Sequence, residues 1–226
     1  SETQFSVDNG EILYGLAAIK NVGANVVDSI IEERKKNGPY KSFMDFLSRQ
    51  GETTLNSRLV ECLIKAGCFD ELGVDRAVLL ANLDEAFRFD KAQKSQSAFG
   101  QLSLFGGEEE DMLGEFEMKN ADPLPFLEKL KMEKELLGFY ISGHPLDSYE
   151  KEINECVKVN VSDPDTIILG QDTQIIGQII AQKVVISKKS GGKLLFLTIQ
   201  TQDGDVEAAV FTKVYEKIDG KTEVDG

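Results

Sequence analysis

The sequence predicts an α+β protein that is mainly α-helical and carries a β-rich segment near its end. Up to about Glu152, apolar residues recur every three to four positions, as in amphipathic helices, except between Lys94 and Glu117. After Asp163-Pro164 the pattern changes to short alternating runs rich in β-branched residues, which is typical of strands. With 226 residues and 41% hydrophobic content, the chain is long enough for one or two domains with packed cores.

The first expected element is a β-hairpin within residues 1–15. Residues from Phe5 to Tyr14 alternate in polarity around Asn9-Gly10, and Asn-Gly is a strong hairpin signal. We expect this hairpin to pack on a preceding domain. The chain has no initiator Met and ends at Asp225-Gly226, as a piece of a longer protein would.

Next comes a helix-turn-helix with the short joint Asn21-Val22-Gly23. Apolar residues share one helical face on each side of the joint: Leu16, Ile19, Val26, Val27, Ile30 and Ile31. Gly23 would let another molecule approach the unpaired N–H groups and the positive dipole end of the second helix, with Lys20 beside it. The joint is therefore a candidate phosphate site. The alternative is a glycine joint that only connects two packed helices.

A second helix pair of similar layout has Gly67 at its joint and a helix from Asp75 to about Ala92. Asp70 and Glu71 would repel a phosphate at this joint, so we expect its role to be mainly structural. The two pairs together predict one α domain over residues 16–94.

Two stretches of the chain resemble one family. Tyr14–Gly23 (YGLAAIKNVG) and Glu133–Glu150 (EKELLGFYISGHPLDSYE) are similar to the helix-hairpin-helix region of the C-family bacterial replicative polymerases, the DNA polymerase III alpha subunits. The resemblance implies a tandem helix-hairpin-helix domain that binds duplex DNA. Asn21 stands where a glycine is common, and asparagine tolerates positive φ better than most residues. The residues expected to contact DNA phosphates are Lys20, Asn21, Val22, Gly23, Asn25 and Gly67.

Residues 95–120 are expected to form a flexible linker, because Gly, Ser and acidic side chains dominate them. Within the linker lies the apolar run QLSLF, which either folds back on its own domain or fills a pocket on a partner. The run resembles the peptide by which bacterial polymerases bind the ring-shaped sliding clamp. The clamp-binding residues that this implies are Gln101 in a polar subsite, Leu102 and Ser103 beside it, and Leu104 and Phe105 as apolar anchors.

Residues 121–165 are predicted to be a helical connector whose helix ends at Ser142-Gly143-His144-Pro145, since proline cannot continue a helix. His144 is the only histidine, and no nucleophile or ligand set surrounds it in the sequence. We interpret it as a turn residue.

Residues 170–226 resemble the start of an OB fold, left incomplete after three expected strands. These strands are Thr173–Ile186, which contains Gly177, then Leu194–Gln200 and Asp205–Phe211. OB folds bind single strands through basic grooves and aromatic stacking. The candidate contacts with single-stranded DNA are Lys183, Lys188, Lys189, Lys193 and Phe196, with Phe211 as another possible platform. The alternative for Phe196 is a core position.

The net charge of −14 excludes a protein that coats nucleic acid uniformly. Most of that charge lies in residues 67–170, which hold 10 Lys/Arg against 22 Asp/Glu. Residues 1–66 hold 8 against 9, and residues 171–226 hold 7 against 8. Both ends are therefore close to neutral and can present local basic faces.

Other classes of protein find no support in the sequence. No apolar run approaches the roughly 18–20 residues of a membrane span, and no signal peptide is evident. The three cysteines have no metal-type spacing, which fits a reducing, cytoplasmic location. We find no phosphate-binding loop, zinc motif or nucleophile elbow, so we expect these residues to be catalytically silent and to need no cofactor. The resemblance implies a parent DNA-directed DNA polymerase that uses Mg²⁺ at carboxylates outside this sequence.

The sequence thus predicts a region that holds duplex DNA and tethers a replicative polymerase to its clamp. Expected partners are duplex DNA, the sliding clamp, other subunits of the polymerase III holoenzyme and single-stranded DNA. One alternative is a scaffold that packs on other polymerase domains without touching DNA. Another is a hairpin-bearing repair nuclease, which would need a catalytic segment that we do not find.

Overall fold

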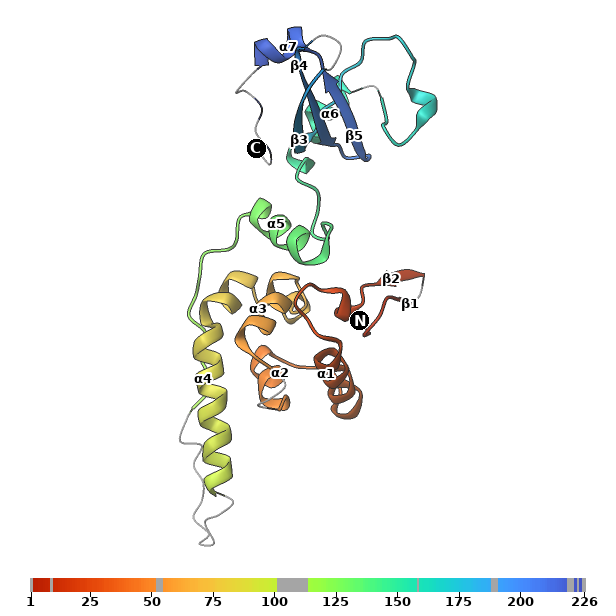
Figure 1. Cartoon of the computed structure of the whole chain (residues 1–226). Coiled ribbons are helices and arrows are strands. Elements are labelled where there is room, and N and C mark those ends of the chain that lie inside the picture. Colours follow the sequence, from red (N-terminus) through yellow and green to blue (C-terminus); the bar gives the residue numbers. More distant parts are fainter. Residues whose placement is uncertain are drawn as a thin grey trace. The chain divides into compact units, whose positions relative to one another are not determined.

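The computed structural model describes residues 2–8, 10–51, 55–100, 114–157, 159–187, 191–218, 222 and 224. The chain divides into two compact units, residues 1–142 and 143–226 (Figure 1). The first unit is helical apart from a small hairpin, and the second contains a three-stranded antiparallel sheet. The predicted α+β class is confirmed. No helix in the described part of the chain is both long and apolar enough to cross a membrane.

The first unit opens with the predicted hairpin. Strands β1 (Ser6–Asp8) and β2 (Glu11–Leu13) pair antiparallel, with Val7 opposite Ile12. The helices that follow are η1 (Leu16–Ala18), α1 (Ala24–Asn37), α2 (Phe43–Arg49), α3 (Ser57–Lys65), η2 (Asp70–Leu72), α4 (Arg76–Gly100) and α5 (Phe126–Leu137).

The first helix of the first pair is shorter than the sequence predicts: η1 is a single 3-10 turn. The N–H groups of Leu16 and Ala17 donate to the carbonyls of Glu2 and Thr3. Ile19 is already extended, with ψ 127°, and this ends the turn. Hydrogen bonds to the N-terminal residues therefore take the place of the intrahelical bonds that a longer helix would form here.

One hydrophobic core joins the helices of this unit. Its fully or nearly buried members include Val27 and Ile30 of α1, Phe43 and Phe46 of α2, Val60 and Ile64 of α3, Leu79 and Leu83 of α4, and Leu136 of α5. Side-chain caps set two of the helix starts. The Ser42 hydroxyl accepts from the Asp45 N–H at 3.0 Å, and the side-chain oxygen Oδ1 of Asn56 accepts from the Leu59 N–H at 2.9 Å.

The helix α4 runs to Gly100, beyond the end near Ala92 that its apolar pattern predicts. The chain that returns after the undescribed residues 101–113 packs against the same domain, with the Phe116 ring 5.3 Å from that of Phe89. The Lys119 N–H donates to the buried Asn82 side chain, whose amide donates back to the Lys119 carbonyl. Residues 114–119 therefore lie against the helical domain, and the expected linker does not extend through them.

The predicted connector, residues 121–165, is divided between the two units. Its helix α5 buries Leu136 and Leu137 in the core of the first unit, and the boundary falls at Ser142. His144 lies in a turn just after this boundary, where its Nδ1 accepts from the Leu146 N–H at 3.2 Å. This agrees with the interpretation of His144 as a turn residue.

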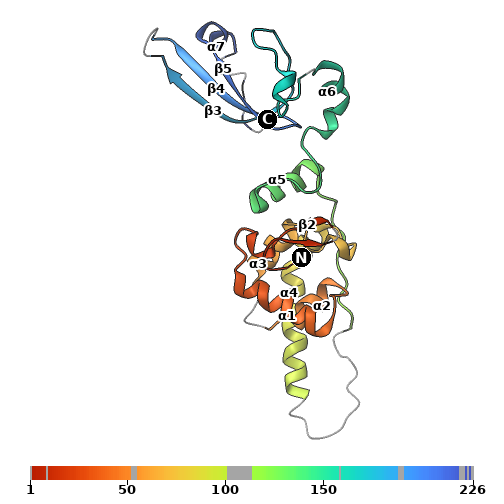
Figure 2. The same ribbon diagram turned by 90° about the vertical axis from the view of Figure 1, so that its right-hand side faces the viewer.

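The second unit holds the sheet, in the order β3-β4-β5 (Figure 2). Its elements are η3 (Asp147–Tyr149), α6 (Glu150–Cys156), η4 (Pro164–Thr166), β3 (Gln178–Ile186), β4 (Lys193–Gln200), β5 (Asp205–Val210) and α7 (Thr212–Ile218). Both strand pairs are antiparallel, and the central strand β4 buries Leu195 and Leu197 on one face. This meander is consistent with an incomplete OB fold.

Candidate nucleic-acid interface

The predicted joint forms a sharp corner between η1 and α1. Asn21 has φ 68°, the left-handed region, and no other non-glycine residue among those described has a positive φ. Asn21 thus adopts the positive φ that asparagine is expected to tolerate at this joint. Val22 follows with its side chain in the core, and its N–H donates to the Ile19 carbonyl at 3.1 Å. Val22 therefore anchors the corner, and neither its side chain nor its N–H is available to a phosphate.

The start of α1 is open. Gly23 precedes the helix in an extended conformation and provides no side-chain cap, and the first turn carries no acidic residue. The Gly23 carbonyl accepts from Val26 and Val27, and among the described residues the structure records no acceptor for the N–H groups of Gly23, Ala24 and Asn25. A Cβ built on Gly23 would meet no atom within 4 Å. These amides and the helix dipole can therefore receive an anion.

The corner brings most of the predicted phosphate contacts to one exposed surface. Lys20, Asn21, Gly23 and Asn25 are all exposed, and only Val22 is turned inward. Beside the open amides, Lys20 provides a cation, and Asn21 and Asn25 each provide a side-chain amide. The arrangement suits a phosphate diester, which offers charge and acceptors but no base identity.

Sequence reasoning missed that α5 supports the corner from far along the chain. The Lys20 N–H donates to the Leu136 carbonyl at 3.0 Å, and the Tyr14 hydroxyl donates to the Leu137 carbonyl at 3.3 Å. The two stretches that carry the family resemblance, residues 14–23 and 133–150, thus touch each other. Their shared resemblance to one family was the only sequence signal for this contact.

Gly67 does not belong to the candidate phosphate site. It has φ +80° and ends α3: its N–H donates to the Ile64 carbonyl, and the Cys68 N–H donates to the Leu63 carbonyl. This is a glycine C-cap. The Arg76 guanidinium and the Asp70 carboxylate occupy the space that a phosphate would need. We therefore leave Gly67 out of the phosphate-binding set, in line with the structural role expected for this joint.

A buried ion-pair network holds the second joint to α5. Arg76 is 3% exposed and Glu133 0%, and a 2.9 Å contact joins the guanidinium to the carboxylate. Arg76 also pairs with Asp70 at 2.6 Å and donates to the Lys65 carbonyl at 3.1 Å. The second Glu133 oxygen accepts from the N–H groups of Ile141 and Ser142, at 2.7 and 2.9 Å.

Burial alone would raise the pKa of Glu133, but the bonds from the Ser142 hydroxyl, from the Ser142 and Ile141 amides and from Arg76 outweigh it. The pKa of Glu133 therefore lies below its ordinary value, and the carboxylate is charged at neutral pH. The apolar periodicity did not indicate this network, because Glu133 occupies a core-facing position of α5.

We expect alanine at the two joint glycines to have opposite effects on stability. Gly67→Ala forces a Cβ into left-handed backbone and against Arg76, so the free energy of unfolding should fall by about 1–3 kcal/mol. Gly23→Ala places a Cβ in open space at φ −77° and should change stability by less than about 0.5 kcal/mol. Urea denaturation measures both. Equal losses would contradict this assignment of the two joints.

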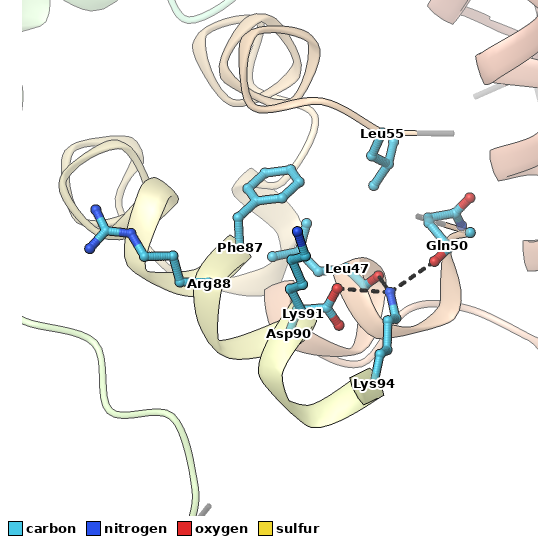
Figure 3. A pocket seen from close by; sticks show the side chains of 9 residues that line it. Leu47, Gln50, Leu55, Phe87, Arg88, Asp90, Lys91 and Lys94 are labelled. Carbon is cyan, nitrogen blue, oxygen red and sulfur yellow. Dashed lines mark hydrogen bonds and ion pairs between the residues drawn. The ribbon is translucent and has the colours of Figure 1, made fainter. Parts of the chain in front are cut away.

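A pocket of about 280 Å³ lies between the end of α2 and α4 (Figure 3). In it the Lys94 ammonium donates to the Leu47 and Gln50 carbonyls, at 3.0 and 2.9 Å, and to Asp90 at 2.7 Å. A lysine bound to the last carbonyls of a helix acts as its C-terminal cap. Lys94 thus caps the end of α2 from within this pocket.

The sheet of the second unit separates the predicted single-strand contacts. Lys183 and Phe196 are directly paired across β3 and β4, so their side chains share one face. Lys193 lies at an odd position of β4, on the face of Leu195, with its ammonium 5.6 Å from the centre of the Tyr215 ring of α7. Lys188 and Lys189 lie outside the described residues. Phe211 is exposed directly after β5.

The predicted clamp-binding residues Gln101, Leu102, Ser103, Leu104 and Phe105 also lie outside the described residues. The structure gives the positions on either side of them: α4 ends at Gly100, and the described chain resumes at Gly114.

Comparison with known proteins agrees with this geometry. A family model described as a helix-hairpin-helix motif matches residues 1–79, which include the corner and both joints. Among curated proteins, the DNA polymerase III subunit alpha of Borreliella burgdorferi is 39% identical over 95% of this chain and 19% of its own length. The subunits of Treponema pallidum and Thermus aquaticus are 37% and 36% identical, over 96% and 98% of this chain and 18% of their own lengths.

The chain thus spans about one fifth of the length of these relatives. The similarity covers both units and both stretches quoted above. By its sequence, the chain belongs with the DNA polymerase III alpha subunits and corresponds to one segment of them.

Proposed function

We propose that the chain holds duplex DNA by its sugar-phosphate backbone, as part of a DNA polymerase whose other parts carry out template-directed synthesis. The observation that supports this most is the open start of α1, where exposed amides meet Lys20 and no acidic residue intervenes. Backbone contact of this kind is independent of sequence, which a polymerase that copies every template requires. The parent would use Mg²⁺ at carboxylates outside this segment.

A salt titration tests the proposal. Lys20→Glu should weaken binding to duplex DNA by roughly tenfold and make the slope of log K against log salt shallower by about one unit. Fluorescence anisotropy with a labelled duplex measures both quantities. The control is Lys91→Glu, the same charge reversal at an exposed position of α4. Equal loss in both variants, or binding that does not depend on salt, would contradict the proposal.

We also propose that residues 101–105 tether the polymerase to the sliding clamp. Support comes from the resemblance of QLSLF to clamp-binding peptides and from its place in the chain. The run begins directly after the last residue of α4, beyond the α4 residues that lie in the core. The other holoenzyme subunits are proposed as partners of the whole protein.

Single-stranded DNA is a proposed ligand of the second unit, on the sheet face that carries Lys183 and Phe196. Their cross-strand pairing sets a cation beside an aromatic ring, the combination that single-strand-binding surfaces use. Lys193 is not included, because it lies on the opposite face.

A specific observation favours a second candidate, the interaction scaffold. The β1–β2 hairpin exposes Val7 and Ile12 at 72% and 77%, and Phe5 beside it at 56%. Large exposed apolar side chains grouped on one element are typical of a protein interface. In this alternative the first unit packs on other domains, and duplex binding is absent or insensitive to salt.

A further inference from the structure

An exposed aromatic ring lies beside the corner. Phe139 comes two residues after the end of α5 and is 43% exposed. Its ring meets that of Tyr14 edge to face, with centroids 5.3 Å apart, and Tyr14 meets Phe5 in the same way at 4.7 Å. The Tyr14 hydroxyl donates to the Ala18 and Leu137 carbonyls, so the central ring of the three is fixed. Phe139 is therefore held in place although much of it is in contact with water.

Phe139 is close to the proposed phosphate contact. The Leu136 carbonyl, three positions earlier, accepts the N–H of Lys20 itself. Gly138 lies between them in left-handed backbone, with φ 87°, and turns the chain as α5 ends. A nucleotide next to a phosphate held at the corner would lie within reach of this ring, because neighbouring phosphates of one strand are only several ångströms apart.

The charges beside Phe139 favour a nucleic acid over an apolar protein surface. Lys20 and Lys134 are both exposed, and the Lys134 ammonium lies 5.1 Å from the centre of the Tyr140 ring. Of the two carboxylates near the end of α5, Glu133 is buried and paired with Arg76, so its charge is neutralised within the domain, whereas Glu135 is exposed beside Lys134. Lysines alternating with aromatic rings are typical of surfaces that bind unpaired nucleotides.

We propose that Phe139, flanked by Lys134 and Tyr140, is a stacking platform for an unpaired base at the end of a duplex whose backbone is held at the corner. The inference rests on the proposed function of the corner and adds to it a contact between one ring and the first unpaired base of a single-stranded extension. An aromatic ring can stack on any of the four bases, so this contact would be as independent of sequence as the proposed phosphate contacts at the corner.

The test uses the whole 226-residue chain and two DNA probes, a blunt duplex and the same duplex with a short extension. The first unpaired base is 2-aminopurine, whose fluorescence falls when it stacks. We expect Phe139→Leu to weaken binding to the extended duplex by about tenfold, to leave the blunt duplex within about twofold, and to remove the quenching. Phe139→Trp should restore both.

The matched control is Phe126→Leu. Phe126 is 44% exposed at the opposite end of the same helix, and its replacement should change neither probe. Circular dichroism melting establishes that Phe139→Leu is folded. If extended and blunt duplexes bind the wild-type chain equally, or if Phe139→Leu binds both as wild type does, the stacking proposal is wrong, whereas the proposed phosphate contact at the corner is unaffected. If no duplex binds and Lys20→Glu has no effect, both proposals fall.

Discussion

Replacing Glu133 with alanine is expected to lower the free energy of unfolding of the helical unit by about 3–5 kcal/mol. The Arg76 guanidinium is almost fully buried, and the substitution would take away its buried carboxylate partner. The N–H groups of Ile141 and Ser142 would lose their acceptor as well. Breaking one side of a buried ion pair costs more than the pair contributes, because the remaining charge is left desolvated. Urea denaturation followed by far-UV circular dichroism measures the loss.

Two variants on the same helix separate this effect from general damage to α5. Glu135→Ala removes an exposed carboxylate two positions away and should change stability by less than about 0.5 kcal/mol. Glu133→Gln keeps the shape and one acceptor but removes the charge, so its loss should be intermediate. Similar losses from Glu133→Ala and Glu135→Ala would show that the network does not stabilise the fold.

The same carboxylate should make stability depend on pH on the acid side. Because the pKa of Glu133 is lower in the folded protein than in the unfolded chain, its contribution is complete above the ordinary glutamate pKa. The contribution is lost as pH falls through the lower, folded-state pKa. The wild-type chain should therefore lose stability on acidification more steeply than Glu133→Gln does, and parallel curves would contradict this.

Local pattern was enough to predict much of the fold. The Asn-Gly hairpin, the period of α1 and the alternation of β4 each depend on residues close together in the sequence, and each is present in the structure. The corner was predictable for the same reason, because the backbone conformations that Asn21 and Gly23 favour are properties of these residue types themselves. Their roles differ: Asn21 supplies the left-handed turn, whereas Gly23 leaves the helix start open.

Contacts between distant segments were not predictable in this way. Nothing near Lys20 in the sequence indicates that its N–H bonds to Leu136, and nothing near Gly67 indicates that Arg76 covers it. The helix α4 is longer than its apolar stripe predicts. Beyond Ala92 its Lys94 bonds to the Leu47 and Gln50 carbonyls at the end of α2, a polar contact that the apolar pattern does not reveal. Which face of the sheet each lysine occupies depends on how β3 and β4 pair, and this pairing is not evident from the sequence. It places Lys183 and Lys193 on opposite faces.

Replacing both Leu104 and Phe105 with alanine is expected to weaken binding to a bacterial sliding clamp by at least about 100-fold. The two side chains are the proposed anchors in an apolar pocket of the ring. Burying a large apolar side chain contributes about 1.5–3 kcal/mol, so the two together carry most of the affinity expected of a short peptide. Gln101→Ala should cost less, because it removes one polar contact and leaves the anchors in place.

Surface plasmon resonance with immobilised clamp measures the loss, and Leu113→Ala, an apolar truncation outside the QLSLF run, serves as the control. The melting temperature distinguishes the fold-back alternative. If the run packed on its own domain, removing two buried apolar side chains would destabilise the chain by several kcal/mol. If the run is a tag for the clamp, the double variant should melt with the wild type while its clamp affinity disappears. Unchanged clamp affinity together with a lowered melting temperature would assign Leu104 and Phe105 to the core of their own domain.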